Sequence, residues 1–158
     1  MKRILYNKLY AFGIAIAFIL GFGVKGYAAY DYSNVVAGDT IMITSGTNIV
    51  AIANNNDNVN LSVVTSFTGP ACLWVVESDN NSFRFRSLQY PTKYITGTNN
   101  NANLTSSTRG TSYTFATVNN KNVIMYSNNR YFRLYQSIFS TTPYWRLVSN
   151  ANNAANLT

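Results

Sequence analysis

Short apolar stretches alternate with polar loops three times along residues 38–149, at a spacing of about forty residues. The clearest marker is a triplet with bulky apolar ends, which occurs at residues 41–43, 83–85 and 123–125. A fixed period of this size is typical of a repeated supersecondary unit that cannot bury its apolar face alone. The pattern therefore predicts three similar units packed around a shared core.

Within each unit the apolar residues alternate with period two, which is the spacing of a strand with one buried face. No stretch after residue 37 shows a helical period with capping residues, so the sequence predicts an all-β protein. The predicted strands of the first unit are residues 40–44, 49–53, 60–64 and 73–77. Those of the second are 83–87, 94–98, 103–106 and 113–118, and those of the third are 123–126, 131–135 and 145–149. The third unit is predicted to be shortened, with its third strand short or lost.

Large aromatic residues recur at the starts of predicted strands. Trp74, Phe115 and Trp145 mark the fourth strand of each unit, and Tyr94 and Tyr131 open the second strand in two of them. Aromatic side chains supply much of the buried area of a core. We predict that these five residues are structural.

Asparagine-rich stretches lie at residues 54–62, 99–105 and 152–158. Asparagine tolerates left-handed backbone angles and caps turns with its own amide, so these stretches predict turns between strands. The alternative is a polar amide surface that binds sugars. The last stretch follows the final strand instead of preceding it, so residues 150–158 are either an asparagine-rich tail or a closing strand.

The N-terminal residues have the pattern of an export signal. A basic start precedes the uncharged apolar run 11–24, and small residues surround Ala28, where we expect cleavage after residues 1–28. The run is shorter than the roughly 20 residues of a transmembrane helix, so we expect no stable membrane insertion after cleavage. Residues 29–37 are then a short lead-in to the domain at 38–149. The cleaved chain has a net charge of +3 instead of +7, and we expect it to be secreted to an extracellular or periplasmic location.

Three four-strand units with an aromatic residue opening the fourth strand resemble a β-trefoil, and the group most similar is that of ricin-B-type lectin-like domains. A Gln-x-Trp motif marks the fourth strand in that group. The corresponding triplets here are residues 72–74, 112–114 beside Phe115, and 143–145, in which the glutamine is absent. The resemblance implies a β-trefoil fold and carbohydrate binding. In that group the sugar is held by an acidic residue early in the repeat, an aromatic ring and an amide, but no acid recurs at equivalent positions in this chain.

The chemistry available to the chain argues against catalysis. Histidine is absent, which removes Ser-His and Cys-His nucleophiles and imidazole metal sites. The five acids do not cluster, and Glu77 and Asp79 border a predicted turn, so neither a glycosidase pair nor a metal site is predicted. No cofactor motif occurs. The alternation in residues 83–86 puts Arg84 and Arg86 on one solvated strand face, so no nucleic-acid partner is predicted.

The best ligand-binding candidates are aromatic and amide residues in predicted loops. Tyr90 precedes Pro91 and Tyr144 follows Pro143, so we expect both rings to stand exposed, where an aromatic face stacks on a sugar while amides bind its hydroxyl groups. The predicted set is Tyr90, Lys93, Asn101, Asn129, Arg130 and Tyr144. The second unit is the first place to look, because Tyr90, Lys93 and the stretch 99–103 are expected to lie together.

Two functions fit these observations. The first is a secreted, non-catalytic carbohydrate-binding protein whose partner is a glycan or cell-surface carbohydrate. The second is a secreted interaction or surface-assembly protein with a protein partner, such as an adhesin component, an inhibitor or a toxin accessory subunit, because fold does not imply function.

Overall fold

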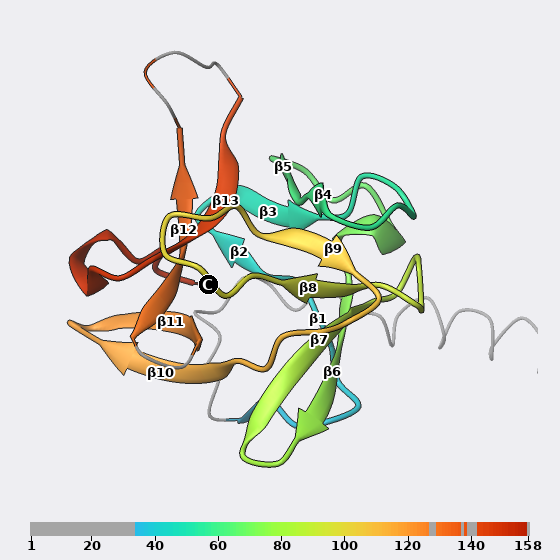
Figure 1. Ribbon diagram of the computed structural model, residues 1–158, viewed down its shortest axis with the longest axis horizontal. Helices are drawn as coiled ribbons and strands as arrows, with labels where there is room; N and C mark the ends of the chain where they lie inside the picture. Colours follow the sequence, from blue (N-terminus) through green and yellow to red (C-terminus); the bar gives the residue numbers. More distant parts are fainter. Residues whose placement is uncertain (1–33, 127–128, 137, 139–141, 158) are drawn as a thin grey trace, which may run out of the picture. The chain divides into compact units, whose positions relative to one another are not determined.

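The computed structural model describes residues 34–126, 129–136, 138 and 142–157, which belong to one compact unit (Figure 1). The predicted signal segment lies outside the described residues. The described part of the chain is built from short strands and two 3-10 helices, which confirms the all-β prediction. The strands are β1 (Thr40–Ile41), β2 (Thr44–Ser45), β3 (Asn48–Ala51), β4 (Val59–Asn60), β5 (Ser62–Val64), β6 (Trp74–Asp79), β7 (Ser82–Ser87), β8 (Tyr94–Thr96), β9 (Thr105–Ser107), β10 (Thr114–Val118), β11 (Lys121–Tyr126), β12 (Arg130–Tyr135) and β13 (Tyr144–Val148). The 3-10 helices are η2 (Pro70–Cys72) and η3 (Ala151–Asn153).

The strands form three antiparallel sheets with the orders β1-β6-β7-β8-β9-β4, β10-β11-β12-β13 and β2-β3-β5. Asparagines make the tight turns. Asn119 and Asn120 connect β10 to β11 with φ angles of 51° and 59°, as a two-residue hairpin loop requires. The six non-glycine residues with positive φ in the described chain are all asparagines, and two of them, Asn58 and Asn101, lie in the asparagine-rich stretches, where the turn prediction holds at these two positions.

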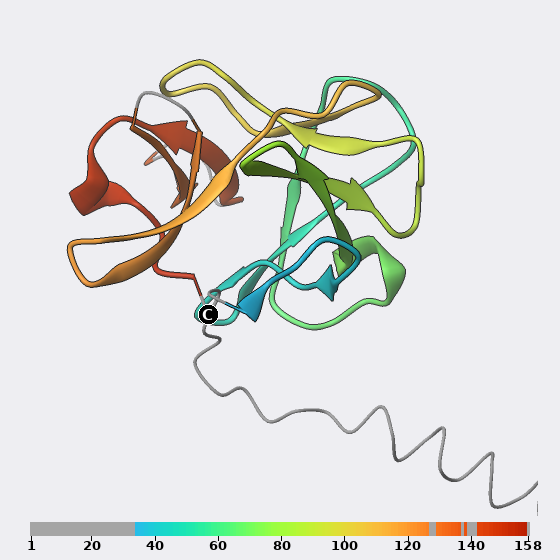
Figure 2. The ribbon, with the colours of Figure 1, turned by 90° about the horizontal axis from the view of Figure 1, so that it is seen from below.

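One pairing pattern occurs in three successive segments of the chain. β3 pairs with β5, β8 with β9, and β12 with β13, each time antiparallel. The three segments occupy successive sectors when the molecule is seen from below (Figure 2). Their inward residues meet in one core, in which the register makes Val50, Ile95 and Phe132 equivalent and makes Leu61, Leu104 and Trp145 equivalent.

The prediction that Trp145 opens the same strand as Trp74 is wrong. Leu61 N donates to Leu104 O (2.9 Å) and Leu104 N donates to Trp145 O (2.8 Å). Trp145 therefore occupies in the third segment the third-strand position that leucine occupies in the first two. A core position selects for volume and apolarity, and an indole fills there the space that leucine fills in the other segments. The third strand that the sequence analysis considered short or lost is therefore β13.

The last residues of the chain occupy the fourth-strand position of the third segment. Ala155 N donates to Phe132 O (2.8 Å), just as Thr111 N donates to Ile95 O (3.3 Å) in the second segment. Ala154 and Ala155 are buried, and Lys121 Nζ donates to Asn152 O (2.8 Å) and Ala154 O (3.3 Å). Residues 150–157 are thus held by packing and hydrogen bonds.

The register also identifies the residue of the second segment that corresponds to Trp74. Trp74 lies opposite Ile41, and Tyr113 lies opposite Phe83, so Tyr113 takes this position instead of Phe115. Tyr113 is 1% exposed, whereas Phe115 is half-buried and packs its ring against Phe83, with 5.5 Å between the ring centroids.

Candidate functional site

Lys93 lies at a junction between the first and second segments. Its Nζ atom is 2.8 Å from Asp57 Oδ1, and the Thr108 amide donates to the same oxygen at 3.0 Å. Lys93 is 6% exposed. The hydrogen bond from Lys93 holds the pKa of Asp57 below its usual value against the opposing effect of desolvation, and the Thr108 amide contributes in the same direction. The positive charge of Lys93 and the negative charge of Asp57 therefore pair with each other inside the protein.

Tyr90 lies near this junction but does not stand free, contrary to expectation. Its ring is half-buried and packs against the main core. Gln89 Nε2 donates to its hydroxyl group (3.2 Å), and the Tyr90 amide donates to Ser87 Oγ (3.1 Å). These two hydrogen bonds and the contact with the core hold Tyr90 in place.

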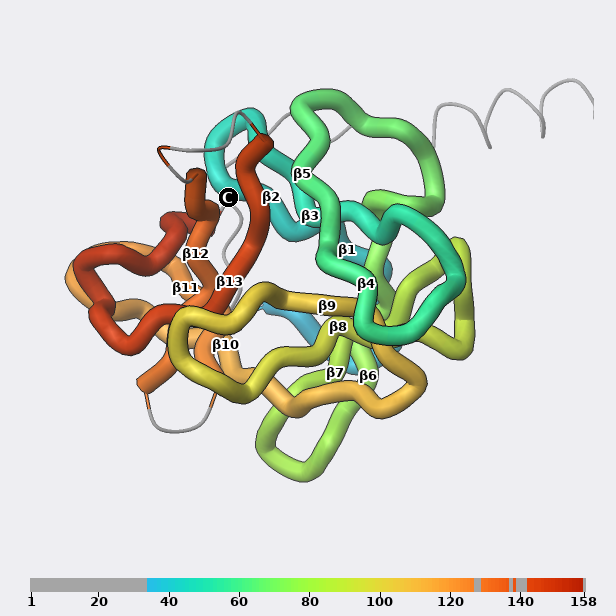
Figure 3. The backbone as a smooth tube through the Cα atoms, turned by 45° about the horizontal axis from the view of Figure 1, so that its top comes forward, coloured from blue at the N-terminus to red at the C-terminus, as the bar shows by residue number. Residues whose placement is uncertain are grey.

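Asn101 lies away from Tyr90 and Lys93, so the predicted site in the second segment is not assembled. Lys93 precedes β8, whereas Asn101 is in the loop at the opposite end of the β8–β9 pair. Figure 3 shows this loop beside β13, where Asn101 N donates to Leu147 O (2.8 Å). Asn101 and Asn129 are exposed and have φ angles of 60° and 57°, which makes both of them turn residues.

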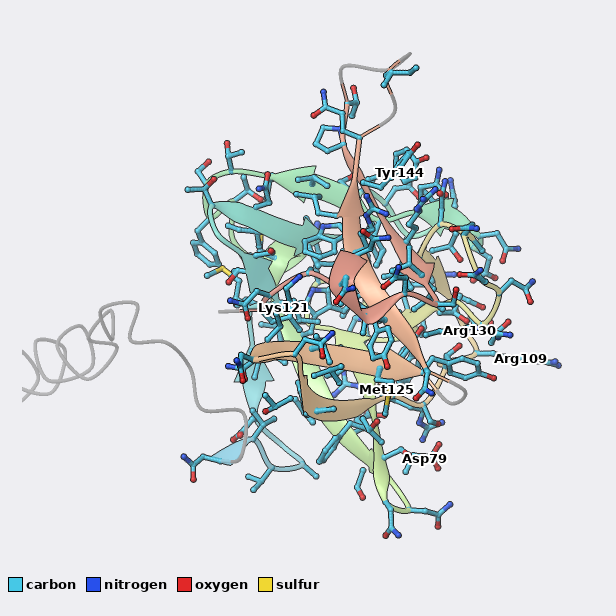
Figure 4. All side chains as sticks on the ribbon, turned by 90° about the vertical axis from the view of Figure 1, so that its left-hand side faces the viewer. Asp79, Arg109, Lys121, Met125, Arg130 and Tyr144 are labelled. Atoms are coloured by element: carbon cyan, nitrogen blue, oxygen red, sulfur yellow. The ribbon has the colours of Figure 1, made fainter. Side chains whose placement is uncertain are left out.

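Arg130 ties this same loop to β12. Its Nη1 atom donates to the carbonyl oxygen of Thr98, and its guanidinium carbon lies 5.9 Å from the centre of the Tyr126 ring. Figure 4 shows Arg130 well separated from Tyr144. The structure therefore distributes the six predicted ligand-binding residues over several places.

Tyr144 belongs to a cluster that the sequence analysis missed. Period-two alternation along β12 and β13 puts Arg133, Tyr135, Tyr144 and Arg146 on one face of the hairpin, and we call these four residues the tyrosine–arginine face. Arg133 lies directly opposite Arg146, and Tyr135 lies directly opposite Tyr144. Period-two alternation alone would have put Arg133 and Tyr135 on one face of their strand, whereas their pairing with Arg146 and Tyr144 depends on the register of the two strands.

The ring of Tyr135 is the centre of the tyrosine–arginine face. The guanidinium carbon of Arg146 lies 3.6 Å from its centroid, and that of Arg133 lies 5.3 Å away. The Tyr144 ring is 5.3 Å from the Tyr135 ring, at an interplanar angle of 59°. These contacts are in the range of cation–π and aromatic pairing, so the four side chains support one another.

The two faces of the β12–β13 hairpin have different surroundings. On the inner face Phe132 and Trp145 are part of the main core. On the outer face Tyr131 and Val148 are covered by Ala154 and its neighbours in a second apolar cluster. The tyrosine–arginine face follows next along the same outer side of the hairpin, where Arg146 forms an isolated antiparallel bridge to Asn103. Its four side chains are half-buried, as Tyr90 is, so Tyr144 does not stand fully exposed as expected, but part of each side chain remains open to solvent.

The residues predicted to be structural occupy packed positions. Trp74, Trp145 and Tyr131 are buried, and Trp74 Nε1 donates to Val50 O (3.1 Å). Tyr94 is half-buried beneath Arg84, whose guanidinium carbon is 5.7 Å from its ring centre.

The described carboxylates each have a local partner. Asp39 accepts from the Val36 amide (2.9 Å) and Glu77 pairs with Arg86 (2.5 Å). Asp79 accepts from the Ser112 hydroxyl group. The described residues contain no group of three metal-ligating side chains. Among the same residues, no helix is long and apolar enough to cross a membrane.

Comparison with known proteins shows similarity in three dimensions only. No protein-family model matches the chain, and no curated protein matches it in sequence. The structure is similar to that of a ricin B-like lectin from Macrolepiota procera solved with lactose, with a TM-score of 0.65 and 15% identity over 78% of this chain and 95% of the lectin. It is also similar to a GH54 α-L-arabinofuranosidase (TM-score 0.59, 16% identity) and to an endo-β-galactosidase from Clostridium perfringens (TM-score 0.57, 11% identity). These matches cover 78% and 75% of this chain but only 31% of each enzyme. The chain thus has the β-trefoil-like fold of a ricin B-like lectin.

Proposed function

We propose that the protein is a secreted carbohydrate-binding protein without catalytic activity, and that it binds sugar on the tyrosine–arginine face. The observation that carries this proposal is the pairing of two half-buried tyrosine rings with two arginines on one accessible hairpin face. An aromatic ring stacks on the apolar side of a sugar, and guanidinium groups donate hydrogen bonds to its oxygens. The fold shared with a lectin solved with lactose supports the same assignment.

Tyr144 is the ring that we assign to sugar stacking. The Arg146 guanidinium covers Tyr135 at 3.6 Å, so Tyr135 acts as the support for the cluster. We expect Tyr144→Ala to weaken binding by at least about tenfold, as for a central aromatic contact, while Tyr144→Phe retains most of the affinity. Tyr90→Ala is the matched control, because Tyr90 is also a half-buried tyrosine but does not belong to the tyrosine–arginine face.

Binding should be measured first on a glycan array and then by calorimetry with the best glycan. Loss of binding in Tyr144→Ala with retention in Tyr90→Ala supports the proposal. Equal affinity of Tyr144→Ala and the wild type would remove the tyrosine–arginine face as the site, and failure to bind any glycan at millimolar concentration would count against carbohydrate binding itself.

The absence of catalysis is inferred from the local partners of the described carboxylates and from the lack of histidine. Two of the similar structures are glycosidases, so the test is a direct assay with 4-nitrophenyl α-L-arabinofuranoside, the compound soaked into one of them. We expect no release of nitrophenol above a buffer control. Sustained turnover that is abolished by Glu77→Gln or Asp79→Asn would contradict the proposal.

Export is inferred from the basic and apolar pattern before Ala28. N-terminal sequencing of the exported protein is expected to begin at Ala29. A protein that retains Met1 and stays with the membrane fraction would contradict cleavage.

A further inference from the structure

We propose that the tyrosine–arginine face selects saccharides that carry an acidic group, a carboxylate or a sulfate, over their neutral counterparts. This inference rests on the proposed carbohydrate-binding function and adds the chemical class of the ligand.

The first observation is the uneven distribution of charge along the chain. All five acidic residues precede residue 80, whereas eight of the twelve basic residues follow it. The two ion pairs among the described residues join Arg86 to Glu77 and Lys93 to Asp57. Arg133 and Arg146 therefore have no carboxylate partner in the part of the chain that the structure describes.

The second observation is that these two arginines are held together. Arg133 and Arg146 lie directly opposite each other in the β12–β13 pair, where like charges repel. Contacts with Tyr135 keep both guanidinium groups on the same ring, and Arg146 Nε is buried without a hydrogen-bond partner. A bound oxyanion would offset this repulsion.

The third observation is the position of Tyr144 next to this pair of charges. Its ring and the Arg146 guanidinium both contact Tyr135, at 5.3 Å and 3.6 Å. A sugar stacked on Tyr144 can therefore direct an acidic substituent to the arginines. Guanidinium groups bind carboxylate and sulfate-like oxyanions with charge-assisted hydrogen bonds, which neutral hydroxyl groups do not match.

The test compares glycans that differ only in one acidic group. Lactose and 3′-sulfolactose form one such pair, 3′-sialyllactose and its neutral methyl ester form another, and an array extends the comparison to other neutral glycans and their sialylated, uronic-acid and sulfated counterparts. We expect the acidic members to bind at least about tenfold more tightly than the neutral ones. The sialylated and sulfated members show whether a carboxylate or a sulfate is preferred.

Variants locate the preference. We expect Arg133→Gln and Arg146→Gln to reduce the ratio of acidic to neutral affinity towards one. Arg109→Gln is the matched control, because Arg109 is exposed, has no carboxylate partner in the described chain and lies far from Tyr144 in Figure 4. Arg133→Gln alone decides the question if Arg146→Gln does not fold.

Three results would overturn the proposal. Neutral glycans that bind as tightly as their acidic counterparts would refute acidic selectivity while leaving carbohydrate binding intact. An equal loss of preference in Arg109→Gln would show that overall charge, and not this face, attracts acidic glycans. No binding to any glycan would refute both this inference and the proposed function.

Discussion

The Lys93 junction and the tyrosine–arginine face place positive charge in contrasting ways. At the junction a buried lysine meets Asp57 at 2.8 Å, and a backbone amide completes the arrangement. On the tyrosine–arginine face two arginines lie opposite each other on one tyrosine ring, without a carboxylate among the described residues. A charge that is paired with a carboxylate of the protein contributes to the folded structure. A charge that is held in position but has no carboxylate partner is available to bind a ligand. We therefore assign a structural role to the junction and a binding role to the face.

The largest expected effect separates the two faces of the β12–β13 hairpin. Trp145 is fully buried, and replacing it by alanine is expected to cost about 3–5 kcal/mol of unfolding free energy through a large cavity. Its neighbour Tyr144 is half-buried, so Tyr144→Ala is expected to cost far less. Urea unfolding of both variants measures the difference, and similar losses would contradict the assignment of inner and outer faces.

The next effect concerns the junction. Lys93→Met keeps the length of the buried side chain but removes its bond to Asp57, so we expect a lower midpoint of thermal unfolding than in the wild type. Glycan affinity should stay unchanged, since the junction is assigned to structure. A variant with normal stability and lost glycan binding would reverse the two assignments.

A smaller effect tests the asparagine turns. Asn101 has a φ of 60°, so Asn101→Ala is expected to cost about 1 kcal/mol of stability, because a Cβ group disfavours left-handed angles. Asn101→Gly accommodates the same angle and should be nearly neutral. Chemical unfolding distinguishes the two variants. Equal stability of both, combined with weaker glycan binding, would instead indicate a ligand-binding amide.

The smallest effect is a dependence on pH. The pKa of Asp57 is lowered in the folded protein, so its contribution to stability is present above the usual value of 3.8 and is lost as the pH falls below it. The stability advantage of the wild type over Asp57→Asn should therefore be constant near neutral pH and shrink below about pH 4. Thermal unfolding at several pH values measures it, and an advantage that grows on acidification would contradict the pairing with Lys93.

Local patterns predicted the strands and turns well. Period-two alternation gave the all-β fold, and Tyr94 and Tyr131 do occupy equivalent places, opposite Ser107 and Val148. Asparagine at tight turns follows from its tolerance of positive φ, which is a property of the single residue. These features are set by neighbouring residues and are therefore visible in sequence.

The candidate site depended on contacts between distant residues. Lys93 meets Asp57, thirty-six positions earlier, and nothing in either local pattern indicates this pair. Trp145 was placed in the wrong strand because a core position accepts leucine or tryptophan alike, so an aromatic residue does not identify its strand. Tyr135 and Arg146 become neighbours only through the β12–β13 register, which tertiary packing determines.

The most direct test of the account is the change in backbone amide chemical shifts during titration with a bound glycan. We predict that the largest changes occur at Arg133, Tyr135, Tyr144 and Arg146, with little change at Tyr90 and Lys93. Changes centred on Tyr90 and Lys93, with the tyrosine–arginine face unaffected, would contradict it.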